Sequence, residues 1–309
     1  MTRTLSIICV GGVVLDRIFY VDALPHGAGK SVASDYRERG GGMAATAAAA
    51  IAALGARATL WARIGDDPTG RTTLAELERA GIDVSGLRIC TRGRTATSTV
   101  HIDAAGDRAL TNFRGHMPAD TQHLDPDRLG RADAILGDVR WPEGSLWAFE
   151  RARSVGIPTI LDADAGSVEA LPQLVARAAH TIFSQQGLRE LTKEHSAARG
   201  LRAAAEIAPE DAVLGVTCGE SGSLWLHKGT MAEMPAFSVA AINTNGVGDV
   251  FHGAYALAIA EGGSHLSAAR FASAVAALKC ADPRGWDGMP SRAVCEAFLA
   301  DREPIEAAR

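Results

Sequence analysis

The segment Asn243–Asp249 combines residue types that can bind an anion and activate a nucleophile beside it. Two of its glycines flank Val247, and glycines there allow backbone N–H groups to turn toward a common point. An apolar, helix-like run over residues 250–260 follows, so the helix dipole adds positive potential at that point. Asp249 either caps this helix or accepts a proton from a group that attacks a bound phosphate. The spacing therefore predicts an anion site, with capping as the alternative role of the carboxylate.

Three other segments could line the same site. Asp16 follows the first expected strand, where a carboxylate can accept hydrogen bonds from sugar hydroxyls or simply occupy a turn. The triple glycine at residues 40–42 opens an alanine-rich helix and offers a hinge and a close approach to a ligand. Residues 217–222 place two more glycines after another expected strand.

The elements that must position these residues alternate between short β-branched runs and alanine-rich helical runs. This alternation predicts an α/β fold with a doubly wound, mainly parallel sheet and helices on both faces. The N-terminal residues 1–10 contain the first buried strand, and the central strands are expected at 58–64, 134–136, 159–161, 181–183 and 213–217. Helices are expected at 44–54, 70–80, 147–155, 188–193, 197–207, 250–260, 266–279 and 292–299, with Gly55, Gly81 and Gly262 as left-handed C-caps.

Two regions interrupt this alternation, residues 13–39 and 95–113. Both alternate apolar and polar residues with almost no helical period, which predicts four strands of a small antiparallel β lid. A pair of surface loops is the alternative. We expect residues 1–309 to form a single domain that carries this lid.

Composition narrows the class of protein. With 309 residues, 47% hydrophobic and 22% charged, the chain has enough apolar material for a large core. Its formal charge of −5, with scattered Lys and Arg, disfavours nucleic acid as a partner. The five cysteines form no metal-binding or disulfide pattern, and the apolar N-terminal run is too short for a signal peptide or a membrane span. We therefore expect a cytoplasmic protein without a membrane partner.

Two separated signatures carry a resemblance to a known family. The first comprises residues 41–47, 54–56, 64–67 and 81–83, and the second is Asn243–Asp249. The second agrees with Asp-Thr-x-Gly-Ala-Gly-Asp at four of the six specified positions, with Asn243 in place of the first Asp and Val247 in place of Ala. Thr217, Gly219 and Gly222 fit Thr-x-Gly-x-x-Gly. Together these motifs resemble the ribokinase-like, or PfkB, carbohydrate kinases over nearly the whole chain.

The resemblance implies transfer of the γ-phosphoryl group of ATP to a sugar or nucleoside hydroxyl, with Mg²⁺ bridging the phosphates. It makes Asp249 the base, which agrees with the physical interpretation of the segment. The remaining implied roles follow the motifs. The amides of Gly246, Val247 and Gly248 would stabilise the transferring phosphoryl group; Asp16, Gly41 and Gly42 would bind the sugar; and Thr217, Gly219, Gly222 and Asn245 would lie near the nucleotide. No metal ligand is assigned.

Within the family, Lys30, Asn112 and Arg140 resemble the residues that hold the sulfonate in 6-deoxy-6-sulfofructose kinases. A sulfonate has three acceptor oxygens and a permanent charge, which such donors suit. The resemblance then implies phosphorylation of the C1 hydroxyl of an anionic ketose. Solvated surface charges are the alternative for Lys30 and Arg140.

The sequence also departs from the family. The usual Asn-x-x-Glu motif falls at Ser184 and Gly187, a loss that the sulfofructose kinases share. Asn243 and Asn245 replace residues that help bind potassium in ribokinases, so we predict little or no potassium activation. Alternatives are a kinase for a neutral sugar or nucleoside and a non-catalytic sugar-binding regulator. A dinucleotide-dependent oxidoreductase is disfavoured because residues 11–15 lack Gly-x-Gly-x-x-Gly. Family members often pair through the lid, which implies a homodimer.

Overall fold

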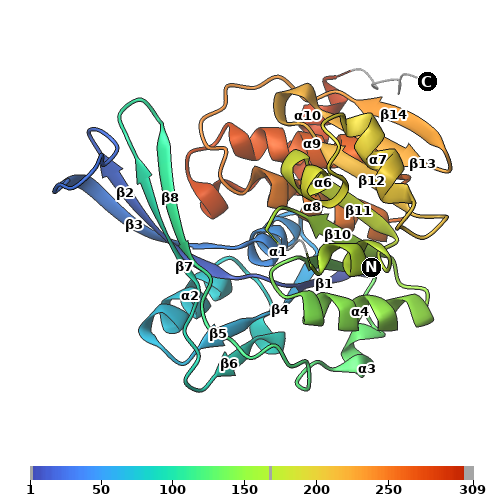
Figure 1. Ribbon diagram of the computed structural model, residues 1–309, viewed down its shortest axis with the longest axis horizontal. Helices are drawn as coiled ribbons and strands as arrows, with labels where there is room; N and C mark the ends of the chain where they lie inside the picture. The colour runs from blue at the N-terminus through green and yellow to red at the C-terminus, as the bar shows by residue number, and fades with distance from the viewer. Residues whose placement is uncertain (1–2, 167–168, 303–309) are drawn as a thin grey trace.

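The computed structural model describes residues 3–166 and 169–302, which form an α/β fold around an eight-stranded sheet (Figure 1). From β12 to β4 the strands pair in parallel, and β13 and β14 extend the sheet as an antiparallel hairpin. In spatial order the strands are β14 (Thr230–Met234), β13 (Ser223–His227), β12 (Val213–Thr217), β11 (His180–Ser184), β10 (Thr159–Ala163), β9 (Ala134–Asp138), β1 (Ser6–Val10) and β4 (Arg57–Trp61). The α/β fold with a mainly parallel sheet expected from the sequence is confirmed.

Helices cover both faces of this sheet because alternate strand residues point to opposite sides. Ile7 and Cys9 of β1 pack into one core with α1, α8 and α9, whereas Ile8 and Val10 pack into a second core on the other face. The helices are α1 (Met43–Ala53), α2 (Pro68–Arg79), α3 (Pro126–Leu129), α4 (Pro142–Ser154), α5 (Leu171–Val175), α6 (Gln185–Thr192), α7 (Ala197–Ala205), α8 (Val247–Ala260), α9 (His265–Cys280) and α10 (Arg292–Ala300).

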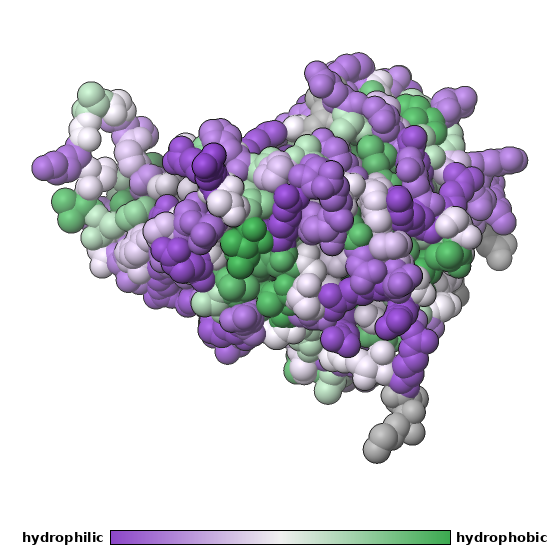
Figure 2. Space-filling view, turned by 90° about the horizontal axis from the view of Figure 1, so that it is seen from below, coloured by the Kyte–Doolittle hydropathy of each residue, from purple (hydrophilic) through white to green (hydrophobic). Residues whose placement is uncertain are grey.

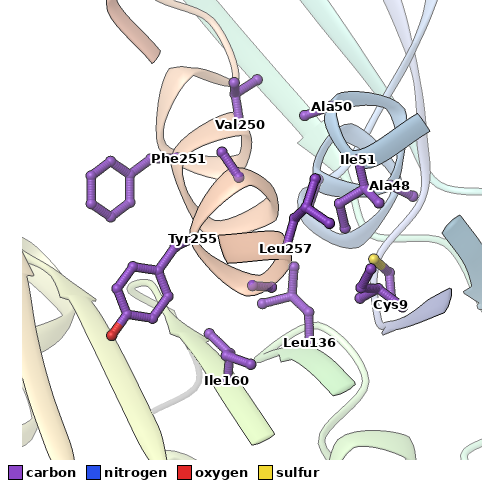
Figure 3. Packing of buried hydrophobic residues seen from close by; sticks show 14 of the residues in the cluster. Cys9, Ala48, Ala50, Ile51, Leu136, Ile160, Val250, Phe251, Tyr255 and Leu257 are labelled. Atoms are coloured by element: carbon purple, nitrogen blue, oxygen red, sulfur yellow. The ribbon is translucent and has the colours of Figure 1, made fainter. Parts of the chain in front are cut away.

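Helix α8, like α1, is deeply embedded in the core. Its residues Phe251 and Tyr255 face the strands, and Leu257 points toward α1 (Figure 3). Gly253 faces α1 directly, since a Cβ there would lie 2.5 Å from the carbonyl oxygen of Ala47. The two helices therefore touch through backbone, which only small residues permit.

A four-stranded sheet, hereafter the small sheet, projects from one side of the molecule (Figure 1). Its order is β3 (Ala33–Gly41), β2 (Val14–Val21), β7 (Thr97–Ile102) and β8 (Arg108–Phe113). The strands fall in the two regions predicted for them. The outer pairings are antiparallel as expected, and the central β2–β7 pairing, which was not predicted, is parallel. Both central strands, β2 and β7, run outward from the main body. The chain then returns along β3 after β2, and along β8 after β7.

Most element boundaries match the sequence expectation within a few residues, and Gly55, Gly81 and Gly262 have the expected positive φ. The strand expected over 58–64 is instead two strands, because β4 ends at Trp61 and β5 (Arg63–Gly65) pairs with β6 (Arg88–Cys90) in a separate sheet. The hairpin β13–β14 was not predicted.

Within the described ranges, no helix combines the length and apolarity needed to cross a membrane. The division into one domain and a lid stays a prediction.

Candidate functional site

A cavity of about 340 Å³ lies between the inner face of the small sheet and the start of α8. Asp16 lines it from β2, and Asn245, Gly246 and Asp249 line it from the α8 side. The glycines at 40–42 lie between these walls and connect β3 with α1. Segments far apart in the sequence thus meet here.

The start of α8 lacks the side-chain cap found in several other helices, as does the start of α1 after Gly42. In α2, α6, α7 and α9 an Asp or Ser side chain accepts a hydrogen bond from a first-turn N–H group. Helix α8 begins instead at Gly246, with φ of 69° and no side-chain cap. The alternative that Asp249 merely caps the helix therefore fails, and the first-turn N–H groups remain available to an anion.

Asp249 lies in the first turn of α8 with its carboxyl group in a poorly solvated environment. Burial, and to a smaller extent the nearby Asp162 carboxylate, raise its pKa to about 8, although His252 opposes this shift. A carboxylate with such a pKa binds a proton more tightly than an ordinary aspartate, which suits a general base that works near neutral pH.

His252 and Asp162 form a buried pair behind Asp249 that the sequence did not reveal. The Nδ1 atom of His252 lies 2.7 Å from the carbonyl oxygen of Gly248 and 3.3 Å from Oδ2 of Asp162. Its Nε2 atom lies 3.2 Å from the carbonyl oxygen of Ile182. This histidine therefore ties the first turn of α8 to strands β10 and β11. A histidine three residues after the aspartate was the only sequence signal, and by itself it is weak.

Asp16 occupies the position expected of a sugar-binding carboxylate. Burial raises its pKa, while hydrogen bonds from Ser98 and Asn245 lower it. A Cβ at Gly41 would lie 2.5 Å from Oδ2 of Asp16, so a larger residue there would displace this carboxylate. Gly42 has φ of 96° and packs against the backbone of residues 12 and 13. These two glycines therefore bring the β3–α1 connection against the carboxylate.

Thr217, Gly219 and Gly222 lie at the carboxyl end of β12, outside the cavity lining. The two glycines have φ of 60° and 86°, and Cys218 donates a 2.7 Å backbone hydrogen bond to the carbonyl oxygen of Gly222. This turn leads into β13. Its role near a nucleotide stays a prediction.

The three residues expected to hold a sulfonate all lie outside the cavity lining. Lys30 is exposed in the connection between β2 and β3. Arg140 bonds Asp164 and the carbonyl oxygen of Ala165, each at 3.0 Å. Asn112 pairs with Ser98 across β8 and β7, which places it on the same face of the small sheet as Asp16.

The cavity is instead lined by basic residues that the sequence analysis did not single out. Arg37, Arg39 and Arg108 extend from the small sheet, and Arg284 follows α9. Together with Lys279 they make five basic side chains, against the two carboxylates of Asp16 and Asp249. Strand pairing brings Arg37, Arg39 and Arg108 together, and the end of α9 adds Lys279 and Arg284, so no contiguous motif could have shown the cluster.

The position of the missing Asn-x-x-Glu motif has a structural explanation. Ser184 caps α6 by accepting a 2.9 Å hydrogen bond from the N–H group of Gly187. A side chain at Gly187 would collide with the backbone of Ala163, so a glutamate does not fit. Among residues 3–166 and 169–302, no group of three or more His, Cys, Asp or Glu side chains forms a metal-binding cluster.

Comparison with known proteins places this arrangement in a family. The family model for "pfkB family carbohydrate kinase" matches residues 4–292. The chain is 29% identical to an ATP-dependent ribose-1-phosphate kinase of Halopiger xanaduensis, over 98% of this chain and 99% of that protein. It is 26% identical to the ribokinase of Bacillus subtilis, over 96% and 99% of the two chains.

Solved structures agree with this family. A protein of Agrobacterium tumefaciens provisionally assigned as a ribokinase is 36% identical and superposes with a TM-score of 0.91, covering 97% of this chain and 100% of that one. The Arabidopsis thaliana ribokinase complexed with ribose and ATP is 21% identical with a TM-score of 0.85, covering 96% and 99%, which shows a shared fold. The chain belongs to the pfkB family of carbohydrate kinases and is an ATP-dependent sugar kinase.

Proposed function

We propose that this kinase phosphorylates a hydroxyl group of a small anionic sugar, either a sugar phosphate or a sugar sulfonate. Asp249 accepts the hydroxyl proton, and the N–H groups of Gly246, Val247 and Gly248 stabilise the charge on the transferring phosphoryl group. Asp16 accepts hydrogen bonds from other sugar hydroxyls. Gly41 and Gly42 allow the sugar to approach the backbone.

The observation that carries this proposal is the excess of basic side chains around the cavity. A neutral sugar would leave a cation that has no carboxylate partner unpaired, whereas a phosphate or sulfonate accepts hydrogen bonds from it. Arg284 already pairs with Asp282. Arg37 and Arg39 pair with Asp35 and Asp287. Among the described residues Arg108 forms no ion pair, and its charge helps to lower the pKa of Lys279. Arg108 is therefore the best single candidate to meet an anionic group.

Ribose 1-phosphate is the first substrate to test, because the Halopiger xanaduensis relative acts on it by name. The second candidate is 6-deoxy-6-sulfofructose, phosphorylated at its C1 hydroxyl. Asn112 favours this ketose, since it shares a sheet face with Asp16, and the absence of the Asn-x-x-Glu motif is consistent with it. In this second case Lys30 and Arg140 would contact the sulfonate.

The remaining components are also proposals. Thr217, Gly219, Gly222 and Asn245 would lie near the nucleotide. Mg²⁺ would accompany ATP and take most of its ligands from phosphate and water, since no carboxylate cluster of the described chain suits it. We propose a cytoplasmic homodimer that pairs through the small sheet, which would act as a lid.

The test is a substrate panel on the wild-type kinase and two matched arginine variants. We expect kcat/KM for an anionic sugar to exceed that for ribose or fructose by at least about tenfold, as one buried charge-assisted hydrogen bond would give. Arg108→Ala should remove this preference, and Arg140→Ala should leave it. The reverse result would assign the anion to the sulfonate residues, and equal rates on neutral and anionic sugars would overturn the proposal.

A further inference from the structure

Lys279 is a buried lysine beside residues 243–246, the loop that precedes α8. The catalytic roles proposed above assign no function to this lysine. It lies in the last turn of α9 and is only 2% exposed. Its ammonium group donates hydrogen bonds to the carbonyl oxygens of Asn243, at 3.1 Å, and Asn245. Among the described residues it forms no ion pair with a carboxylate. A buried ammonium is costly, so its position opposite two carbonyl dipoles needs an explanation.

The end of α9 fixes this loop from several sides. The N–H groups of Ile242 and Asn243 both donate to the carbonyl oxygen of Cys280 at 2.9 Å. The side chain of Asn243 accepts a 3.1 Å hydrogen bond from the N–H group of Asn245. Lys279 completes the set by binding the two carbonyl oxygens. The three residues that precede Gly246 are thus held by one helix end.

The bond to the Asn245 carbonyl also sets the direction of the next N–H group. In a trans peptide unit the C=O of one residue and the N–H of the next point in opposite directions. Holding the Asn245 carbonyl toward Lys279 therefore turns the Gly246 N–H away from it. Without a cation, two carbonyl oxygens beside an anion site would repel the anion that the helix start attracts.

We propose that the Lys279 ammonium group is a built-in substitute for a bound monovalent cation. It neutralises the carbonyl oxygens of Asn243 and Asn245 and thereby orients the N–H groups at the start of α8. Lys279 is a positioning residue, because it acts on the transferring phosphate through the loop. The inference rests on the role proposed above for that loop. Burial lowers the Lys279 pKa to about 8, and the nearby Asp249 carboxylate opposes this shift.

The experiment removes the ammonium group and offers a free cation in its place. In sodium buffer, Lys279→Ala should lower kcat about 100-fold, the loss typical of a disrupted phosphoryl or oxyanion contact. Potassium, ammonium or methylammonium should raise kcat of the variant by at least about tenfold, since the vacated volume admits a small cation. The wild-type kinase should respond to none of them.

Thermal unfolding without nucleotide or sugar gives an independent readout. The melting temperature of Lys279→Ala should rise in a saturable way with potassium or ammonium, whereas wild type should not respond. Lys193→Ala is the matched control, because Lys193 is an exposed lysine that also donates to a carbonyl oxygen, that of Glu190 at 2.8 Å. Its melting curve should not depend on the cation.

Two substitutions keep the inference testable if the alanine variant does not fold. Lys279→Met keeps most of the volume without the charge, so it should be slow and should resist rescue. Lys279→Met with wild-type kcat would overturn the inference, as would a folded Lys279→Ala with no cation response in either assay. If the wild type phosphorylates no sugar, the proposed function fails, and the melting assay still tests Lys279.

Discussion

The two walls of the cavity are built in different ways. On one side, the start of α8 is a contiguous segment anchored in the core, with its first turn tied to neighbouring strands by His252. On the other side, the small sheet stands away from the body, and hydrophilic residues cover much of its surface (Figure 2). Under the proposed function, the chemical step falls to the α8 side, hereafter the rigid wall, and the selection of the sugar falls to the projecting one.

The small sheet assembles its inner face by register rather than by motif. One row across the four strands contains Arg39, Asp16, Ser98 and Asn112, which come from four separate segments. Asp16 is held within this row by the Ser98 hydroxyl. Because alternate residues face opposite sides, a shift of one residue in any pairing would remove a member of the row. Under the proposed function, substrate preference would depend on strand pairing as much as on residue identity.

The strongest test of this contrast is Asp249→Asn, which affects only the rigid wall. Loss of the base should lower kcat by about 10²- to 10⁴-fold. Affinity for sugar and ATP should change little, because the amide keeps the shape of the carboxyl group. Steady-state kinetics together with calorimetric binding measure both effects. Asp66→Asn, an exposed aspartate, is the control, and a near-normal kcat for Asp249→Asn would remove it from the role of base.

A smaller effect is expected from Gly41→Ala, which perturbs the selecting wall. The added Cβ would lie 2.5 Å from Oδ2 of Asp16 and would displace that carboxylate. The KM for the sugar should rise by about tenfold, as for the loss of one charge-assisted hydrogen bond, with the KM for ATP unchanged. Gly29→Ala, where a Cβ meets no atom within 4 Å, should behave as wild type. Equal changes in both KM values would contradict the division between the walls.

The smallest effect concerns stability. The pKa of Asp249 is raised to about 8 in the folded protein, above its ordinary value of 3.8, so ionising it costs folding free energy. This cost is absent below about pH 4, grows as pH rises, and is complete above about pH 8. Asp249→Asn removes it, so the variant should melt at a higher temperature than wild type by a margin that widens from pH 5 to pH 8. A margin independent of pH would contradict the raised pKa.

The sequence predicted the rigid wall well and the projecting wall poorly, for a physical reason. Residues 243–249 determine their own geometry, because Gly246 and the following helix are local features. The arginines of the cavity converge only after β2, β3, β7 and β8 pair, and the parallel β2–β7 pairing has no local signal. Lys279 was missed for a similar reason, since a single lysine within an alanine-rich helix is usually solvated.

The backbone contact between Gly253 and Ala47 gives the two halves of the active site a fixed spacing. Helix α1 begins where the sugar-side glycines end, and α8 begins where the phosphate-side glycines end. Since these helices touch without intervening side chains, backbone contact fixes the distance between the proposed sugar-binding and phosphate-binding sites. Substitution of the arginines of the small sheet can therefore change which sugar binds without altering the alignment of the reacting groups.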